Sequence, residues 1–181
     1  MRNGEFEDPV AGDSGGRRFV ASGRADVTRS WTAGLNRVSI TLPKSASRVT
    51  ETLRAQLAYI LVNDHGAQIH PGSRSYARSW FRDGSMIGAA LLRLGHPEQV
   101  RAFLEWHAPY QFANGTVPCC VDARGADPVP EHDSPGALLA ATADDSRHPG
   151  DTAFPPKRWQ PGTRAGTQSG TLRRDGAQRE T

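Results

Sequence analysis

The chain has 181 residues, about the length of one domain, and 36 % of them are hydrophobic against 23 % charged. No apolar run reaches the roughly 20 residues that a membrane-spanning helix needs, and residues 1–20 lack the apolar stretch of a secretory signal. Composition therefore excludes membrane-spanning, collagen-like and disulfide-scaffold proteins, and we expect a cytoplasmic protein.

Both flanks of the sequence are predicted to be disordered. Residues 1–33 combine Gly pairs with scattered charges and show no apolar periodicity, which indicates a linker or a disordered segment. Residues 146–181 carry seven Lys or Arg and three Asp or Glu, and nine of them are Gly or Pro. This composition buries too little surface to offset chain entropy, so a disordered basic tail is expected. The folded domain is predicted to span 34–145.

A short strand and an amphipathic helix are expected at the start of this domain. Apolar and polar residues alternate over 36–43, as in a half-buried strand. From Ser45 the apolar residues recur at three- and four-residue spacing, and Gly66 lies just beyond the predicted end of the helix. The apolar stripe of this helix consists of Val49, Leu53, Leu57, Ile60 and Leu61.

Two central helices follow a long loop over 66–82. Asp83 stands at the expected N-cap of the first one, which is apolar on almost every side and is therefore predicted to be buried on most sides. Gly95 ends this helix, and Pro97 begins the next after a tight turn. The second central helix is expected to end near Pro109.

A second long loop, 110–133, leads to a weaker helix over 134–143, so the predicted fold class is all-α. The tight turn makes the two central helices antiparallel. The two long loops must then lie at the same end of the helices, because one loop precedes the first central helix and the other follows the second. Loops of this length in compact domains are usually functional, and we expect the site there.

The first long loop ends in a cluster of Arg, Asp and aromatic residues. The Asp83 carboxylate can accept from vicinal sugar hydroxyls, the Arg82 guanidinium can donate to them, and Trp80 or Tyr76 can stack on a pyranose face. The alternative is structural: Asp83 caps its helix and pairs with a nearby Arg, and Trp80 packs within the loop.

The second long loop carries four carboxylates and a histidine over 122–134. Among them, Glu131 and Asp133 could supply an acid, a base or further hydroxyl contacts. The alternative is a polar loop in which Asp133 or Ser134 caps the last helix.

We expect neither a metal site nor a cofactor. The adjacent Cys119 and Cys120 are predicted to be reduced thiols, because neighbouring Cβ atoms point apart and a disulfide between them is strained. Metal-ligand spacing is not evident for these cysteines with His132, or for His65 with His70.

The run RSWFRDG over 78–84, within a longer stretch over 52–134, resembles the start of the catalytic domain of bacterial six-hairpin glycosidases. These enzymes belong to the α/α-toroid superfamily, which includes glucoamylases and trehalases, and the run is similar to their substrate-loop Arg–Asp motif. The resemblance implies a partial toroid, with about two helical hairpins of six, whose long loops form a −1 sugar subsite. Its implied substrate-binding residues are Arg82, Asp83, Trp80 and Tyr76.

The resemblance also implies glycosidic-bond hydrolysis by paired carboxylates, a hydrolase activity in carbohydrate metabolism. In glucoamylase- and trehalase-like enzymes the general acid and base lie in later hairpins, which this sequence does not supply. We therefore expect a fragment that binds carbohydrate and is not catalytically complete. Glu131 and Asp133 are the candidate catalytic residues that remain.

Two other functions compete with this one. A non-enzymatic helical module would bind a partner, or self-associate, through the exposed apolar edges of an incomplete ring. A nucleic-acid binder would use the basic tail, but such a footprint belongs on a folded face, and outside 146–181 the chain has 15 basic and 16 acidic side chains. We expect a carbohydrate substrate and neither a nucleic-acid nor a membrane partner.

Overall fold

The computed structural model describes residues 14–129 and 131–148, and it divides the chain after Arg37 into two units. In the first unit, helix α1 spans Ser14–Leu35. The disorder expected over 1–33 is therefore wrong for 14–33. The side chains over 23–33 are exposed, and a segment that buries no face needs no apolar stripe, so periodicity could not reveal it. The rest of the expected linker, 1–13, lies outside the described residues.

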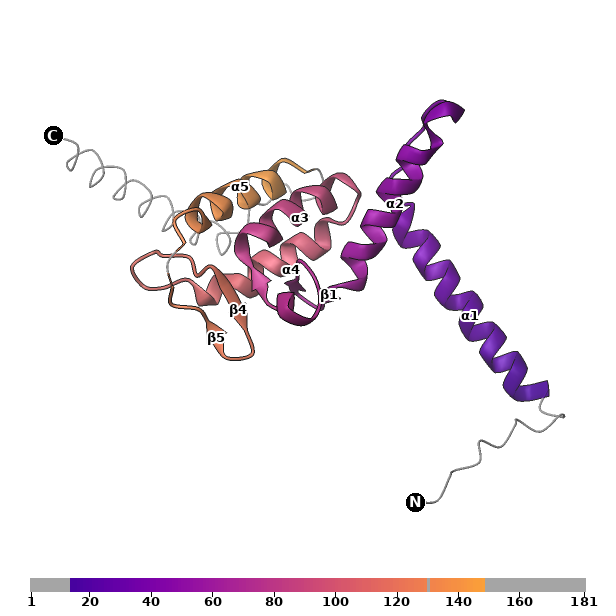
Figure 1. Ribbon diagram of the computed structural model, residues 1–181, viewed down its shortest axis with the longest axis horizontal. Helices are drawn as coiled ribbons and strands as arrows, with labels where there is room; N and C mark the ends of the chain where they lie inside the picture. The colour runs from indigo at the N-terminus through magenta and orange to yellow at the C-terminus, as the bar shows by residue number, and fades with distance from the viewer. Residues whose placement is uncertain (1–13, 130, 149–181) are drawn as a thin grey trace, which may run out of the picture. The chain divides into compact units, whose positions relative to one another are not determined.

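The second unit contains four α-helices among the described residues. They are α2 (Ser47–Val62), α3 (Phe81–Arg93), α4 (Pro97–His107) and α5 (Ser134–Arg147) (Figure 1). Short 3₁₀ turns are η1 (Lys44–Ala46), η2 (Arg74–Tyr76) and η3 (Ala108–Tyr110). Because α5 runs to Arg147, the basic tail begins later than predicted, and 149–181 lie outside the described residues.

The helical class is confirmed, but both long loops also contain short strands. They are β1 (Asp64–His65), β2 (Gln68–Ile69), β3 (Ser79–Trp80), β4 (Cys120–Asp122) and β5 (Gly125–Ala126). One antiparallel sheet pairs β1 with β2, and the other has the order β3-β4-β5. The strand expected over 36–43 does not form, because no described segment pairs with it. The toroid stays a prediction.

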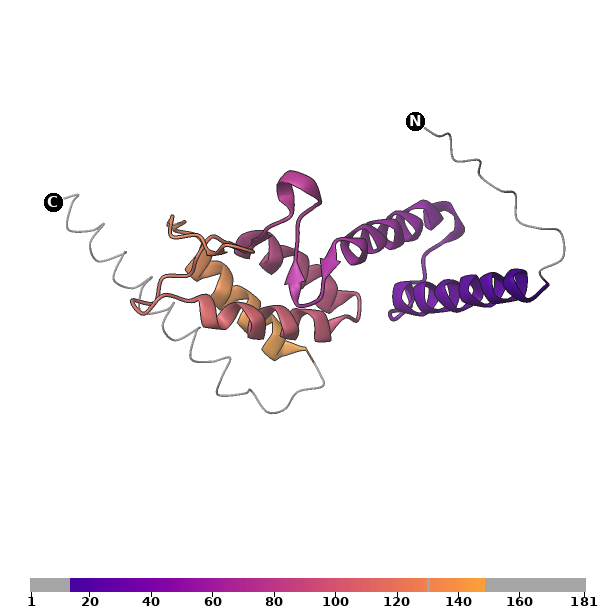
Figure 2. The ribbon, with the colours of Figure 1, turned by 90° about the horizontal axis from the view of Figure 1, so that it is seen from below.

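Helices α3, α4 and α5 pack against one another and carry most of the core (Figures 1 and 2). The prediction that α3 is buried on most sides is wrong in part: Met86 is exposed, because α4 and α5 cover only one broad face of α3. That buried face consists of Phe81, Gly84, Ser85, Gly88, Leu91 and Leu92.

The tight turn between α3 and α4 is confirmed in detail. Gly95 has a φ of +83°, its N–H donates to the Leu92 carbonyl, and the His96 N–H donates to the Leu91 carbonyl at 2.9 Å. This is a Schellman motif, which requires a left-handed residue that glycine supplies without strain. Pro97 then stands in the first turn of α4, where its missing N–H costs nothing. The two helices are antiparallel as a result.

The start of α3 differs from the prediction. Trp80 occupies the N-cap position, and Asp83 lies within the first turn. The reason is that β3 runs directly into the helix: the Phe81 N–H donates to the Cys119 carbonyl at 2.8 Å, so the sheet fixes the first helical residue. Asp133 does stand at the N-cap of α5, but its side chain makes no capping hydrogen bond.

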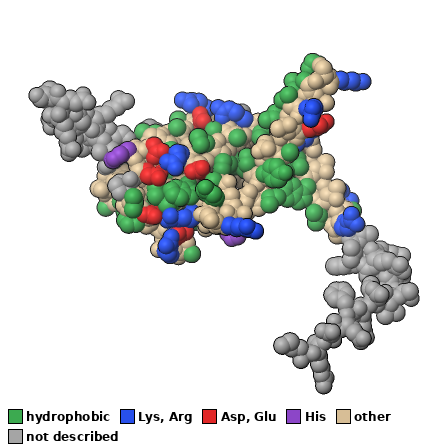
Figure 3. Space-filling view, viewed as in Figure 1, with side chains coloured by type: hydrophobic (Ala, Val, Ile, Leu, Met, Phe, Trp, Pro, Cys, Tyr) green, Lys and Arg blue, Asp and Glu red, His purple; other side chains and the backbone are tan. Residues whose placement is uncertain are grey.

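The amphipathic stripe expected on α2 is present but only partly covered. Leu57 is buried and Ile60 and Leu61 are half-buried, whereas Val49 and Leu53 are exposed. Figure 3 shows hydrophobic side chains gathered along this helix. Apolar periodicity predicted the helix correctly, but it did not predict what would pack against it.

An aromatic cluster lies at the centre of the helical core. The ring centroids of Phe81 and Phe103 are 5.3 Å apart, and the His107 ring stands edge-on to Phe81 at 4.4 Å. Phe103 lies against the backbone of α3 at Gly84. A Cβ atom there would lie 2.9 and 3.0 Å from two atoms of the Phe103 ring and nearer still to Cζ.

We predict that Gly84→Ala lowers the free energy of unfolding by about 1–3 kcal/mol, because the buried Phe103 ring cannot move aside. Gly88→Ala is the matched control, since its Cβ would meet Val100 at an ordinary 3.5 Å. That variant should gain up to about 1 kcal/mol from helix propensity. Urea unfolding of both variants checks the prediction, and equal stabilities would contradict it.

A second prediction concerns His107, which is only 2 % exposed. Burial lowers its pKa to about 4, below the value of about 6.5 for an unfolded chain. Between these values the unfolded chain binds a proton that the folded chain does not. The free energy of unfolding should therefore fall by about 3 kcal/mol as the pH drops from about 6.5 to about 4.

The comparison that isolates this group is the wild-type chain against His107→Leu, which cannot titrate at that position. Unfolding curves recorded between pH 7 and pH 4.5 should show that the stability advantage of the wild type shrinks with falling pH. Parallel pH profiles for the two chains would show that His107 contributes nothing to the acid sensitivity.

Candidate functional site

Four charged side chains meet where α3 and α5 begin, and we name them the Arg82 cluster: Arg82, Asp83, Glu131 and Asp133. Arg82 Nη1 lies 3.0 Å from Glu131 Oε2 and 2.9 Å from Asp133 Oδ2, and its Nε is 4.0 Å from Asp83 Oδ2. The prediction that both long loops lie at the same end of the helices is thereby confirmed.

The Arg82 cluster is partly open to solvent, with 42 % of the Arg82 side chain and 48 % of the Asp133 side chain exposed. The hydrogen bond to Asp133, and then the charges of Glu131 and Asp133, raise the pKa of Arg82. Both carboxylates accept from the same guanidinium nitrogen. The cluster therefore offers carboxylate acceptors beside a cationic donor, a combination that can bind vicinal hydroxyls.

The aromatic residues expected beside Arg82 have different surroundings. Tyr76 in η2 is exposed, and Trp80 in β3 is partly buried. The Arg78 guanidinium covers one face of the Trp80 ring, 5.4 Å from its centroid. A sugar could therefore stack only on the other face of this ring.

A cavity of about 690 Å³ opens beside the β1–β2 hairpin, and we name it the hairpin cavity. Its walls come from the end of α2, the hairpin, the segment around η2, the end of α4 with η3, and the β4–β5 turn. Its volume lies within the range of roughly 300–1,000 Å³ found for small-molecule sites. Its polar and aromatic lining includes Asn63, His65, Gln68, His70, Arg74, Trp106, Tyr110 and Asp122.

The aromatic part of the lining comes from one helical turn. The Trp106 and Tyr110 rings lie 5.3 Å apart at an angle of 56°. At the β1–β2 hairpin, the His65 and His70 rings are stacked with their centroids 5.7 Å apart. His70 Nε2 lies 3.0 Å from the Gln68 side-chain oxygen. The cavity therefore combines ring faces with neutral and charged hydrogen-bonding groups.

Burial shifts two titratable groups of the hairpin. It lowers the pKa of His70, an effect to which the neighbouring His65 adds, and it raises the pKa of Asp64. His70 is therefore neutral near pH 7, and its ring can both donate and accept a hydrogen bond. At the cavity wall, Arg74 has a φ of +57°, a left-handed conformation that is uncommon for a residue with a side chain. Such backbone strain often accompanies functional sites.

The structure brings together Arg82, Asp83, Glu131 and Asp133 where the two long loops meet. None of them lines the hairpin cavity, and neither do Trp80 and Tyr76. The sequence suggested a role for His65 and His70 only as metal ligands, and it gave no functional role to Trp106 or Tyr110. The signal that could have pointed to the cavity is the four-residue spacing of Trp106 and Tyr110 at a helix end.

A second arginine organises the β4–β5 hairpin. Arg78 Nη2 lies 2.8 Å from Asp127 Oδ2, and its Nε lies 3.0 Å from Asp122 Oδ2. Hydrogen bonds from Arg124, helped by the charge of Arg78, lower the pKa of Asp122 to about 2. Asp122 is thus an ionised acceptor at the edge of the hairpin cavity.

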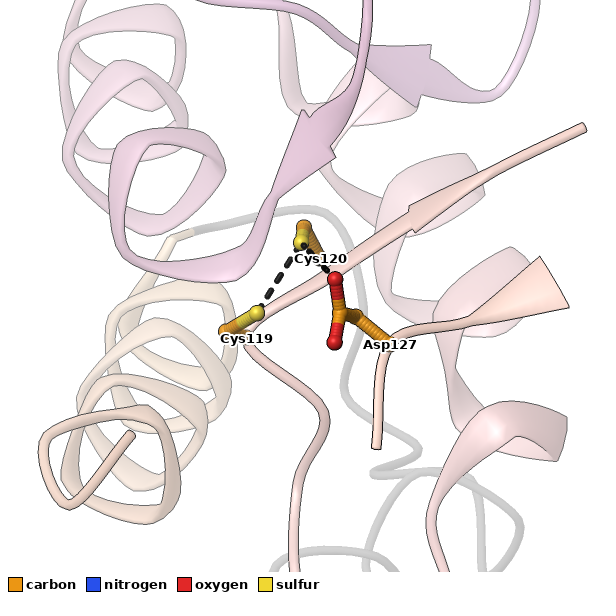
Figure 4. A group of neighbouring side chains, drawn as sticks. All are labelled: Cys119, Cys120 and Asp127. Carbon is orange, nitrogen blue, oxygen red and sulfur yellow. Dashed lines mark hydrogen bonds between the residues drawn. The ribbon is translucent and has the colours of Figure 1, made fainter. Parts of the chain in front are cut away.

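One group of side chains contradicts the expectation that no metal-ligand grouping exists. The ligand atoms of Cys119, Cys120 and Asp127 all lie within 4.8 Å of one another (Figure 4). Asp127, and not His132, joins the two thiols. The spacing of these residues in the sequence gave no sign of this, because the β4–β5 turn returns the chain to the cysteines.

The comparisons with known proteins identify no relative of this chain. No protein-family model, curated protein or solved structure matches this chain. The glycosidase resemblance therefore depends on the residues over 52–134 alone, and it stays a prediction. No described helix combines the length and the apolar character needed to cross a membrane.

Proposed function

We propose that residues 38–148 form a carbohydrate-binding domain of glycoside-hydrolase type, with a saccharide held in the hairpin cavity. One observation carries this proposal: the Trp106 and Tyr110 rings stand in the same cavity as amide, imidazole and carboxylate groups. Saccharides need this combination, because a pyranose has apolar C–H faces and a rim of hydroxyl groups.

Each part of the lining has a role in such a complex. An aromatic ring offers a rigid apolar surface on which a sugar face can stack at little cost in side-chain entropy. Gln68 and neutral His70 can each donate to and accept from hydroxyls. Ionised Asp122 accepts hydroxyl hydrogens in charge-assisted bonds, which are stronger than neutral ones.

The Arg82 cluster would provide a further set of hydroxyl contacts, in line with the role that the resemblance implies for Arg82 and Asp83. Glu131 and Asp133 both accept from one guanidinium nitrogen, so each has an oxygen engaged by Arg82. Hydrolysis of a glycosidic bond needs a separate acid and base on either side of that bond. The described residues are therefore proposed to bind carbohydrate without hydrolysing it.

The binding test uses maltose- and trehalose-type disaccharides and aryl glycosides, with affinity measured by calorimetry. Trp106→Ala should weaken binding at least tenfold, because it removes the stacking surface, and a tenfold loss corresponds to about 1.4 kcal/mol. Trp31→Ala on α1 is the matched control and should leave the affinity unchanged. Absence of binding to every sugar, or equal affinities in the two variants, would contradict the proposal.

The same sugars test catalysis. The chain alone should release no measurable monosaccharide or aglycone. Turnover that disappears in Glu131→Gln would show that this arrangement is catalytically complete and that Glu131 is the general acid.

A second candidate function is favoured by the exposed apolar side chains of α2. Val49 and Leu53 lie one turn apart on the same face of α2 and are both exposed, and exposed apolar residues grouped in this way commonly mark interaction surfaces. We infer that this face binds a second copy of the chain.

Sedimentation equilibrium checks that inference. The wild-type chain should associate increasingly with concentration, and Leu53→Lys should shift it toward the monomer because a charge in the contact is unfavourable. Met86→Lys, at an exposed position of α3, is the control and should behave as the wild type. A chain that is monomeric at every concentration would exclude self-association through α2.

A further inference from the structure

We propose that Cys119, Cys120 and Asp127 form a binding site for a thiophilic divalent cation of the Zn²⁺ or Cd²⁺ class. We name these three residues the thiol cluster. This site is separate from the proposed carbohydrate function, since none of its residues lines the hairpin cavity. Its support comes from geometry, burial and charge.

The three ligand atoms converge from two adjoining segments of the β4–β5 hairpin. The two Sγ atoms lie 2.9 Å apart, and Cys120 Sγ lies 3.9 Å from Asp127 Oδ2. Figure 4 shows the Cys119 and Cys120 side chains turned toward each other, with the Asp127 carboxylate beside Cys120. Both thiols are buried, at 4 % and 0 % exposure.

Backbone hydrogen bonds hold these residues in place. The Asp127 N–H donates to the Cys120 carbonyl at 3.0 Å, and the Phe81 N–H donates to the Cys119 carbonyl at 2.8 Å. Gly125, with a φ of +105°, makes the turn that returns Asp127 to the cysteines. The ligands are therefore positioned by the sheet before any ion arrives, which lowers the ordering cost of binding.

The spacing suits a thiolate-bound ion after a small adjustment. Zinc–sulfur bonds are about 2.3 Å long, so two thiolates at a tetrahedral angle stand about 3.8 Å apart. The two sulfur atoms must then separate by about 1 Å, and the carboxylate oxygen is already near its required distance. Three protein ligands leave a fourth position of a tetrahedral ion open.

The charges of the site also balance when the ion binds. Cysteine binds a metal ion as the thiolate, so each sulfur that ligates the ion gives up its thiol proton to solvent. Two metal–thiolate bonds then neutralise a divalent ion.

Arg78 completes the site by holding the carboxylate. Its Nη2 donates to Asp127 Oδ2 at 2.8 Å, the same oxygen that faces Cys120. A carboxylate oxygen can accept from more than one direction, and ligating carboxylates are commonly oriented by such outer hydrogen bonds. Arg78 is therefore a positioning residue, and the Asp127–Arg78 pair stays neutral beside the ion.

The test is a Cd²⁺ titration of the reduced full chain, followed by the ultraviolet sulfur-to-metal charge-transfer band. The chain has only two cysteines, so any such band reports on this pair. We expect saturation at one Cd²⁺ per chain, release of two protons per ion in weak buffer, and competition by Zn²⁺. Cys119→Ser and Cys120→Ser should each abolish the band.

Asp127→Asn decides whether the carboxylate is a ligand. It should weaken Cd²⁺ binding about tenfold or more while the circular dichroism spectrum stays that of the wild type. Asp144→Asn on α5 is the matched control and should bind as the wild type does. The proposal is overturned if no band forms at stoichiometric Cd²⁺, if one ion binds per two chains, or if Asp127→Asn leaves the affinity unchanged. None of these measurements involves a sugar, so their failure is distinguishable from failure of the carbohydrate proposal.

Discussion

The hydrogen bond from the Phe81 N–H to the Cys119 carbonyl ties the two long loops to the start of α3. It continues the β3–β4 ladder into the first helical residue, so the sheet and the helix share one fixed junction. Phe81 is also fully buried, at the centre of the aromatic core. The Arg82 cluster and the thiol cluster both lie next to this junction, and their geometry depends on it.

Two arginines use this junction to hold the second long loop. Arg78 pairs with Asp122 and Asp127 on the β4–β5 hairpin, and Arg82 pairs with Glu131 and Asp133 ahead of α5. Partly exposed ion pairs contribute little stability individually. Their effect here is to hold the second long loop in place. Each of its four carboxylates, which would otherwise repel one another, forms an ion pair with Arg78 or Arg82.

The polar chemistry of the second unit is therefore divided between separate places. The Arg82 cluster gathers charge at the ends of helices, whereas the hairpin cavity combines the Trp106 and Tyr110 rings with largely neutral hydrogen-bonding groups. In the proposed complex, stacking surfaces and hydroxyl contacts would both come from the cavity. Asp122 connects the cavity with the β4–β5 hairpin, because it lines the cavity and forms an ion pair with Arg78.

The sequence by itself predicted the presence of α3, α4 and α5, the tight turn at Gly95 and the placing of both long loops at one end of the helices. These features follow from local rules of periodicity, helix termination and chain connectivity. Only the tertiary structure placed Asp127 beside the cysteines and enclosed the hairpin cavity, because strands of two or three residues carry no periodic signal and their pairing depends on distant partners. It also decided that the first half of the α2 stripe, Val49 and Leu53, is exposed, since periodicity predicts which face of a helix is apolar but not whether another element covers it.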